Sequence, residues 1–370
     1  MRVAYTHHAF CRRPYTGISR YLTNLASELD ATNLCDVKIV APVYTDRFLS
    51  SMNRELVFGH MLSCNSAITR PVARHLNSLL SPHVLTRWAP EVVHETYYSA
   101  KPVYHSNCRS VLTVYDMIHE KFPDDFSRWD RTRQLKAKAV SRADHIICIS
   151  ENTRQDLLGL LGVSPEKTSV VHLGGDNYAE NLPTPVSEPS LRLQRRPYIL
   201  YVGRREGHKN FSGMIAAYAA SSTLTHNVDV LCFGGGVFSH DEVELLLKFK
   251  IASNVFQING TDSSLYQLFR NALFFVYPSK YEGFGLPPLE AMAVGCVVAC
   301  SNTSSVPEIA GDAAAYFDPH ILDSIRFTLE AVAESASLRT RLRTLGFARR
   351  QLFSWKKCAR ETFNVYRNLG

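Results

Sequence analysis

Two glutamates enclose a glycine loop in the segment 277–295, which reads YPSKYEGFGLPPLEAMAVG. Glu282 lies directly before Gly283–Gly285, and Glu290 follows a pair of prolines. The apolar residues before the loop predict a buried strand, and residues 289–294 predict a helix that ends at a glycine. Prolines are favoured in the first turn of a helix, so the glycines precede a helix N-terminus, whose amide groups and dipole attract anions. The pattern therefore predicts a phosphate site between two carboxylates.

A second group of charged residues follows the predicted strand 198–202. Gly203 ends that strand, and Arg204 and Lys209 lie five positions apart in the loop before the next predicted helix. Two cations on such a loop are suited to hold a diphosphate and to stabilise the negative charge that develops when a diphosphate leaves. Arg205, the neighbour of Arg204, is expected to face solvent.

Strands and helices alternate around both loops. In the first half, the predicted strands are 3–5, 37–40, 92–93, 111–115, 145–149 and 169–172, with helical spacing over 19–29 and 131–142. In the second half, they are 198–202, 228–233, 255–258, 273–277, 297–299 and 314–317. Between the halves, three prolines and two serines within 181–190 predict a linker. The sequence thus predicts an α/β protein with two Rossmann-like domains that bind ligands in a cleft, beyond the carboxyl ends of parallel strands.

The segment 277–295 resembles the E-x7-E signature of the retaining, nucleotide-sugar-dependent glycosyltransferases with the GT-B fold (the family 4, group 1 type). The resemblance implies four parts: an acceptor-side domain at 1–180, a linker at 181–196, a nucleotide-sugar domain at 197–352 and a helix within 353–370 that packs back on the first domain. It implies that Glu290 binds the ribose and that Glu282 binds the sugar of the donor. The other donor contacts that it implies are Gly203, Ser279, Gly283, Phe284, Gly285 and Leu286.

The same resemblance extends the donor site. Arg204 and Lys209 would neutralise the leaving nucleoside diphosphate, so no metal ion and no cofactor are expected. Asn259 and Gly260 resemble the loop that passes the nucleotide base, and a plain turn explains them equally well. Gly17 resembles a glycine after the first strand that lets the backbone approach the donor phosphates.

Residues of the first half supply the acceptor side. Many relatives carry histidine where Tyr115 stands, and the Tyr115-Asp116-Met117 form resembles a subgroup that assembles polysaccharide and lipopolysaccharide. A tyrosine with an ordinary pKa of about 10 can hydrogen-bond the donor sugar but is no base near neutral pH. Asp116 can act as a base toward the acceptor hydroxyl or orient it. The other candidates are Arg20, His94, Tyr97 and His119, and a histidine near a strand end also has a plain structural interpretation.

The implied reaction moves a glycosyl unit with retention at the anomeric carbon. Double displacement needs a carboxylate nucleophile with its partner acid about 5 Å away, and the resemblance places no such nucleophile. It implies instead that the leaving diphosphate takes the acceptor's proton. The Tyr-Asp-Met form favours mannose from GDP-mannose and a lipid-linked glycan as acceptor. Two other classes remain open: an epimerase or phosphorylase with this fold, and a non-catalytic partner subunit, against which the four charged donor residues argue.

The charge pattern bears on larger partners. The net charge is +7, and six cations lie within residues 128–142: Arg128, Arg131, Arg133, Lys136, Lys138 and Arg142. They form either a solvated helix face or a surface for anionic lipid or a phosphate-bearing acceptor, whereas no motif favours nucleic acid. No apolar run approaches the roughly 20 residues of a membrane span, and no signal core precedes the first strand. A cytoplasmic protein, peripheral at most at the inner face of the membrane, is expected.

Overall fold

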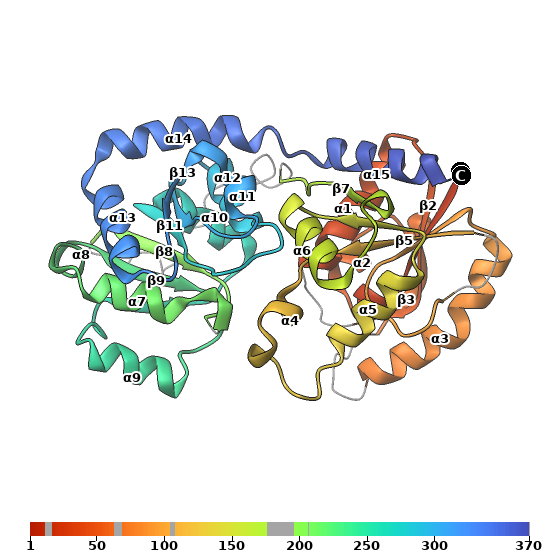
Figure 1. The fold of residues 1–370 in the computed structure, drawn as a ribbon, viewed down its shortest axis with the longest axis horizontal. Helices are drawn as coiled ribbons and strands as arrows, with labels where there is room; N and C mark the ends of the chain where they lie inside the picture. Colours follow the sequence, from red (N-terminus) through yellow and green to blue (C-terminus); the bar gives the residue numbers. More distant parts are fainter. Residues whose placement is uncertain (12–16, 63–68, 104–107, 176–195, 206, 370) are drawn as a thin grey trace. The chain divides into compact units, whose positions relative to one another are not determined.

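The computed structural model describes residues 1–11, 17–62, 69–103, 108–175, 196–205 and 207–369. The chain forms two compact units, one made of Met1–Gly174 with Ser354–Gly370 and the other of Gly175–Phe353 (Figure 1). Residues 181–195 of the predicted linker lie outside the described residues. Each unit has its own parallel sheet and its own covering helices.

The first unit is built on a seven-stranded parallel sheet with the order β3-β2-β1-β4-β5-β6-β7. Its strands are β1 (Arg2–Thr6), β2 (Asp36–Tyr44), β3 (Val57–Met61), β4 (Val92–Glu95), β5 (Arg109–Val114), β6 (His145–Cys148) and β7 (Thr168–Val170). β1, β4 and β5 are nearly continuous runs of buried residues, as parallel strands with both faces covered should be. The edge strand β3 was not predicted, because it is short and only partly buried.

Helices from both ends of the chain cover this sheet. They are α1 (Gly17–Ala31), α2 (Arg47–Ser50), α3 (Thr69–Trp88), α4 (Ile118–Lys121), α5 (Thr132–Arg142), α6 (Glu151–Leu161) and α15 (Trp355–Leu369). Short 3-10 turns lie at His8–Cys11, Arg54–Leu56, Pro123–Asp125 and Pro165–Lys167. α15 packs against α1, and its buried Tyr366 hydroxyl hydrogen-bonds that of Tyr5 at 2.9 Å. The C-terminal helix is therefore part of the first unit's core.

The second unit is built on a six-stranded parallel sheet with the order β10-β9-β8-β11-β12-β13. Its strands are β8 (Tyr198–Val202), β9 (Asp229–Phe233), β10 (Val255–Ile258), β11 (Phe274–Tyr277), β12 (Val298–Ser301) and β13 (Ala314–Phe317). The helices are α7 (Phe211–Ala219), α8 (Ser222–Asn227), α9 (His240–Lys248), α10 (Asp262–Asn271), α11 (Leu286–Ala293), α12 (Val306–Ala310), α13 (Leu322–Glu334) and α14 (Ala336–Arg350), with 3-10 turns at Gly207–Lys209 and Gly311–Ala313. α7 and α9 lie on one side of the sheet, and α10, α11 and α12 lie on the other (Figure 1).

Both sheets have the strand order of a Rossmann fold. In each, the chain adds strands outward on one side of the first strand and then crosses to its other side, so that β1 neighbours β4 and β8 neighbours β11. The carboxyl ends of such a central pair flank the crevice in which Rossmann folds bind ligands. The prediction of two Rossmann-like parts with parallel sheets is confirmed.

Candidate active site

The central strands of the second unit bring the two predicted donor loops together. β8 and β11 pair in parallel with Tyr201 opposite Val276, so their carboxyl ends lie side by side. The loop with residues 203–209 follows β8, and the loop with residues 278–285 follows β11. Segments that are seventy residues apart in the sequence thus meet at the ligand-binding point of the sheet.

Glu282 and Lys209 form an ion pair between these loops, with Nζ of Lys209 2.7 Å from Oε1 of Glu282. Burial acts to raise the pKa of Glu282, but the charge of Lys209 and hydrogen bonds from Lys209, Ser279 and Tyr277 outweigh it. The pKa of this carboxyl therefore lies below its usual value, and Glu282 is an anion at neutral pH. Two residues predicted for one site are thus in direct contact.

The helix after the glycine loop begins earlier than predicted. α11 starts at Leu286 rather than at residue 289, because both prolines lie within its first turn. Gly285 precedes the helix with a φ of +122°, a backbone conformation that side-chain-bearing residues rarely adopt. Gly283 and Phe284 lead to this N-terminus, and Glu290 lies one turn inside the helix and is buried. A helix N-terminus beside Lys209 is suited to a phosphate group.

Hydroxyl groups from the loop between β12 and α12 brace the glycine loop. Ser305 Oγ lies 2.9 Å from the carbonyl oxygen of Glu282 and 2.7 Å from that of Phe284, so its single proton is shared between them, and the Glu282 amide donates to Ser304 Oγ at 3.0 Å. Ser301 Oγ donates to the Ser279 carbonyl oxygen at 2.6 Å. α12 begins at Val306, and its N-cap residue Ser305 makes no side-chain cap to the helix. The Ser305 hydroxyl braces the glycine loop instead.

We expect Ser305→Ala to lower the free energy of unfolding of the second unit by about 1–3 kcal/mol, because it leaves two loop carbonyl groups without their buried donor. Thermal unfolding of the purified chain measures the change. Ser253→Ala, which removes an exposed hydroxyl from the same unit, is the control and should have almost no effect. Equal melting temperatures for both variants would contradict the bracing role.

The two arginines after β8 differ in burial: Arg204 is exposed and Arg205 is buried. Arg204 is exposed at the end of β8, and its carbonyl oxygen accepts a hydrogen bond from Tyr201 Oη at 2.5 Å. Gly203, with a φ of +110°, makes the turn between the end of β8 and Arg204. Arg204 therefore lies at the carboxyl edge of the sheet, and its contact with a donor phosphate stays a prediction.

The expectation that Arg205 faces solvent is wrong. Its side chain is 3% exposed and pairs with Glu242 at 2.8 Å. Its guanidinium group also donates to the carbonyl oxygens of Gly234, Gly236 and Val237 at 2.9–3.0 Å. A buried guanidinium is tolerated when its N–H groups are satisfied in this way. Arg205 therefore fixes the glycine turn after β9 rather than a ligand.

The loop proposed to pass the nucleotide base follows β10, at the edge of the same sheet. Asn259 and Gly260 are both exposed there. Their position at a carboxyl strand end agrees with a ligand contact, although β9 separates β10 from the central strand β8. A Cβ on Gly260 would lie 2.9 Å from the side chain of Ser264, so the turn itself also requires a small residue.

Tyr115 and Asp116 follow β5 in the first unit. Tyr115 is buried, and its hydroxyl donates to the Thr96 carbonyl oxygen at 2.8 Å. Burial also raises the pKa of Tyr115 well above its ordinary value. The Asp116 side chain is 26% exposed and accepts from the Ile118 amide at 3.1 Å. Of the two, Asp116 is the side chain that is open to a ligand.

The role of Lys136 in this region was not predicted from the sequence. The side chain is completely buried, and its Nζ lies 2.7 Å from both the Asp116 carbonyl oxygen and Glu120 Oε2. It also lies 3.8 Å from the Asp116 carboxylate. Lys136 therefore fixes the backbone at Asp116 and brings a positive charge near its side chain. The available signal was its place on the inward side of α5, which it shares with Thr132, Ala139 and Val140.

The two candidate histidines differ in their access to a ligand. His94 is completely buried, with one ring nitrogen bonded to Tyr366 Oη and the other to Thr113 Oγ1 at 2.7 Å. Burial lowers its pKa to about 3. His94 is thus a neutral core residue of the first unit, so its assignment to the acceptor side is not supported. The His119 side chain is 18% exposed and stacks on Phe126, and burial lowers its pKa too.

The remaining acceptor-side candidates also lie in the first unit. Tyr97 follows β4, is 8% exposed and stacks against Tyr115, with ring centroids 6.3 Å apart. Gly17 is exposed and is the first residue of α1, and Arg20, one turn later, is partly buried. The rest of the predicted glycine loop, at residues 15 and 16, lies outside the described residues.

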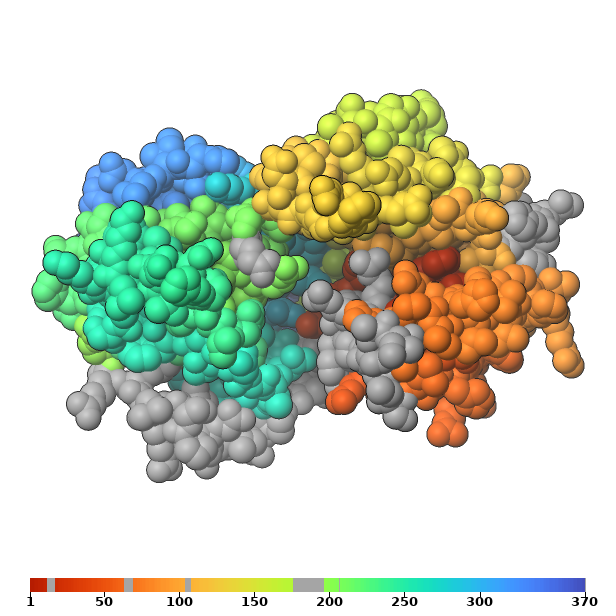
Figure 2. Space-filling view, turned by 90° about the horizontal axis from the view of Figure 1, so that it is seen from below, coloured from red at the N-terminus to blue at the C-terminus, as the bar shows by residue number. Residues whose placement is uncertain are grey.

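The basic stretch 128–142 divides into inward and outward cations. Lys136 is buried, and Arg142 is partly buried, because it pairs with the inward carboxylate of Glu95 and donates to the Ser99 carbonyl oxygen at 2.7 Å. The exposed cations are Arg128, Arg131, Arg133 and Lys138. Figure 2 shows the segment on the surface of the first unit, in yellow. The idea of six surface cations is therefore corrected to four.

Within the described part of the chain, no three histidine, cysteine, aspartate or glutamate side chains gather as a potential metal site. In the same residues, no helix is both long and apolar enough to cross a membrane.

Comparisons with known proteins assign both halves of the chain. The family model described as glycosyl transferases group 1 matches residues 186–347, and the model described as glycosyltransferase family 4 matches residues 15–177. The chain is 28% identical to the O-antigen chain mannosyltransferase B of Escherichia coli, over 96% of this chain and 97% of that one. It is 24% identical to the O-antigen chain mannosyltransferase RfbU of Salmonella typhimurium, over 82% and 83%.

A solved structure agrees with this assignment at the level of the fold. The Anabaena protein Alr3699/HepE, in complex with UDP and glucose, superimposes with a TM-score of 0.74 over the full length of both chains at 14% identity. The chain therefore belongs to the group 1, family 4 glycosyltransferases and has the GT-B fold.

Proposed function

We propose that this glycosyltransferase moves mannose from GDP-mannose, with retention at the anomeric carbon, to a hydroxyl of a growing lipid-linked cell-surface glycan. The O-antigen mannosyltransferases among its relatives support the sugar and the acceptor class. The Tyr115-Asp116-Met117 sequence supports the same choice. The observation that carries the donor site is the ion pair of Lys209 and Glu282 at the carboxyl ends of β8 and β11.

In this proposal the donor diphosphate lies at the N-terminus of α11, beside Lys209 and Arg204. Glu282 accepts hydrogen bonds from sugar hydroxyls, and Glu290 accepts them from the ribose. The acceptor oxygen bonds to the anomeric carbon as the bond from that carbon to the diphosphate breaks. The diphosphate takes the acceptor's proton, and the two cations and the helix dipole stabilise its charge. The reaction runs at the cytoplasmic face of the membrane without metal or cofactor.

Product analysis tests the proposal. The enzyme is incubated with GDP-mannose, with and without octyl α-mannoside as acceptor, in the presence of EDTA, and products are examined by NMR. An α-linked disaccharide, formed only with acceptor, is expected, and a β-linked product would contradict retention. An altered donor sugar without acceptor would indicate an epimerase, and a requirement for inorganic phosphate would indicate a phosphorylase. Binding of GDP-mannose without turnover would indicate a non-catalytic partner.

Glu290→Gln is expected to weaken GDP binding about tenfold to a hundredfold, because a hydrogen bond to a charged acceptor contributes about 1.5–3 kcal/mol. Calorimetric titration with GDP measures the dissociation constant. Glu244→Gln removes the same charge from the exposed face of α9 and serves as the control. The ribose assignment fails if both variants bind GDP as tightly as the unmodified protein.

A further inference from the structure

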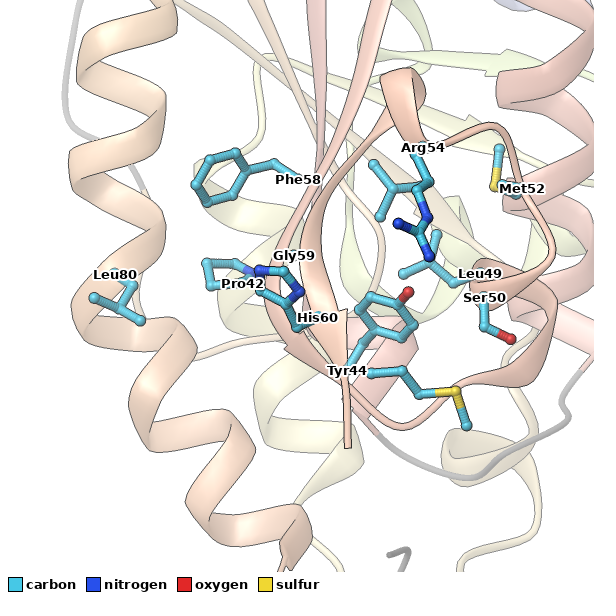
Figure 3. Close-up of a pocket in the computed structure, with 12 residues that line it drawn as sticks. Pro42, Tyr44, Leu49, Ser50, Met52, Arg54, Phe58, Gly59, His60 and Leu80 are labelled. Atoms are coloured by element: carbon cyan, nitrogen blue, oxygen red, sulfur yellow. The ribbon is translucent and has the colours of Figure 1, made fainter. Parts of the chain in front are cut away.

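A cavity of about 620 Å³ lies at the edge of the first unit's sheet, beside β2 and β3 (Figure 3). Its walls come from the end of β2, from the segment that joins β2 to β3, from β3 itself and from Leu80 of α3. Its volume is within the usual range of ligand pockets. Among the described residues that line it, none belongs to the donor loops or to the acceptor candidates. The cavity is therefore a separate place in which a ligand can bind.

The backbone of the two strands is irregular at this cavity. The pairing of β2 with β3 shifts its register between Val40 and Val43. Gly59 of β3 has a φ of +151°, and a Cβ at this position would lie 1.7 Å from the Ala41 carbonyl oxygen, so the close approach of the strands requires glycine. A register shift of this kind re-aims the neighbouring side chains and is common beside functional sites.

Two polar side chains of the cavity can still form hydrogen bonds. The Tyr44 ring is buried, and its hydroxyl points toward the guanidinium group of Arg54 (Figure 3). Burial raises the pKa of Tyr44 although the charge of Arg54 acts to lower it, so the hydroxyl keeps its proton at neutral pH. Among the described residues, neither the hydroxyl nor the guanidinium group has a hydrogen-bond or ion-pair partner. Both groups are therefore available to a polar ligand.

Aromatic and aliphatic side chains form much of the remaining wall. Phe58 on β3 is 46% exposed, and Leu49 and Met52 line the cavity from the joining segment. Sugars match this combination, because their C–H faces pack on apolar side chains while their hydroxyls bond to a few polar groups. A phosphate group matches it less well, because Arg54 is the only arginine or lysine among the described residues of the wall. The cavity thus favours a neutral carbohydrate.

The cavity lies toward the same edge of the sheet as the acceptor candidates. Tyr44 is the last residue of β2, Tyr97 follows β4 and Asp116 follows β5, and the strands are parallel, so their carboxyl ends share one edge. In the order β2-β1-β4-β5, the ends of β2 and β5 are three strand spacings apart, or about 14 Å. A sugar ring spans roughly one strand spacing. A glycan that follows this edge from Asp116 therefore reaches the cavity after about three units.

We propose that this cavity is a second glycan subsite, which holds a sugar of the acceptor chain about three units behind the sugar that receives the transferred residue. The ring of the bound sugar packs on the apolar wall, and its hydroxyls bond to the Tyr44 hydroxyl and the Arg54 guanidinium group. The enzyme thereby distinguishes a growing chain from a single sugar. This inference rests on the proposed function in one respect, which is that the acceptor is a glycan.

Kinetics with acceptors of increasing length test the proposal. Octyl glycosides with one to about five α-linked mannose units are compared at saturating GDP-mannose. We expect the acceptor KM to fall at least about tenfold when the chain reaches about four units, because the fourth sugar gains the contacts of the cavity. Tyr44→Phe/Arg54→Gln keeps the approximate size of both side chains and should raise the KM of the four-unit acceptor about tenfold. The KM of octyl α-mannoside should not change in this variant.

Controls separate the possible outcomes. Arg87→Gln removes an exposed charge from α3 outside the cavity and should leave both KM values unchanged, and melting temperatures check the fold of each variant. Equal KM values for short and long acceptors would overturn the proposal, as would an unchanged four-unit KM in the double variant. A KM that falls instead with the length of the alkyl group, and only while Tyr44 and Arg54 are intact, would identify a lipid site and also overturn it.

A binding measurement keeps this inference distinct from the proposed function. If octyl α-mannoside and its longer forms are all refused as acceptors, the proposed function fails. Calorimetric titration of the full chain with the free mannose tetrasaccharide still reports on the cavity in that case. Binding that the double variant weakens about tenfold supports the subsite. Equal binding by both proteins, or no binding by either, contradicts it.

Discussion

Lys209→Ala is expected to lower kcat by about a hundredfold to a thousandfold, which is the usual effect of removing one group that stabilises a developing negative charge. Lys209 lies on the loop after β8, and its side chain is 26% exposed, so its loss opens no core cavity. The Glu282 side chain, which is 10% exposed, loses its cation, so the second unit should still fold but with a lowered melting temperature. Initial rates at saturating donor and acceptor measure kcat, and thermal unfolding checks the fold.

The same substitution should change the pH dependence of the rate. In the unmodified enzyme the pKa of Glu282 lies below its ordinary value of 4.5 despite burial, because Lys209 and hydrogen bonds favour the anion. The stabilisation from this pair is thus present above about pH 4.5 and is lost as the pH falls through the lowered pKa. Without Lys209, the carboxylate loses the charge and the hydrogen bond that lower its pKa, so burial raises the pKa of Glu282. The acidic limb of the rate profile should move to higher pH.

Two further variants separate charge from general damage near the loop. Lys209→Arg keeps a cation and should restore part of the rate, although guanidinium and ammonium groups differ in geometry. Lys280→Ala removes a lysine from the loop after β11 that has no assigned role and should retain nearly full activity. If Lys209→Ala retains nearly full kcat, the leaving-group role of Lys209 is wrong.

The arrangement of the two candidate donor loops could be predicted from the sequence because their parts are local. A glycine pair and two prolines specify a helix N-terminus within a few residues, and the loop with Arg204 and Lys209 directly follows a predicted strand. Rossmann topology then requires the ends of β8 and β11 to meet. What the local pattern did not contain is the support from Ser305, whose hydroxyl reaches Glu282 and Phe284 from another loop.

The burial of two cationic side chains is the main feature that the sequence did not predict. Arg205 and Lys136 both lie in runs of cations, and a run of charge normally indicates a solvated surface. Burial of each depends on a carboxylate that is distant in sequence, Glu242 for Arg205 and Glu120 for Lys136. Such pairing is a property of the tertiary fold.

Lys136→Met is expected to destabilise the first unit by about 3–5 kcal/mol, because it leaves the carboxylate of Glu120 buried without its cation. The Glu120 side chain is 2% exposed, and among the described residues its Oε1 has no hydrogen-bond partner, so Lys136 is its main compensation. The melting temperature should fall by roughly 10 °C. Lys138→Met, two positions away on the exposed side of α5, should shift it by about 1–2 °C at most.

A double-mutant cycle identifies the cause of that loss. Lys136→Met/Glu120→Leu removes both charges and should recover most of the lost stability, since replacing a buried ion pair with apolar residues is often nearly neutral. No recovery would mean that packing of the lysine chain, rather than its charge, matters. Turnover gives the second comparison: the stable double variant still lacks the bond from Nζ to the Asp116 carbonyl oxygen. If Asp116 orients the acceptor, this variant should show a raised acceptor KM with an unchanged Kd for GDP, because Lys136 acts on Asp116 in the first unit, whereas the proposed ribose and diphosphate contacts Glu290, Arg204 and Lys209 lie in the second.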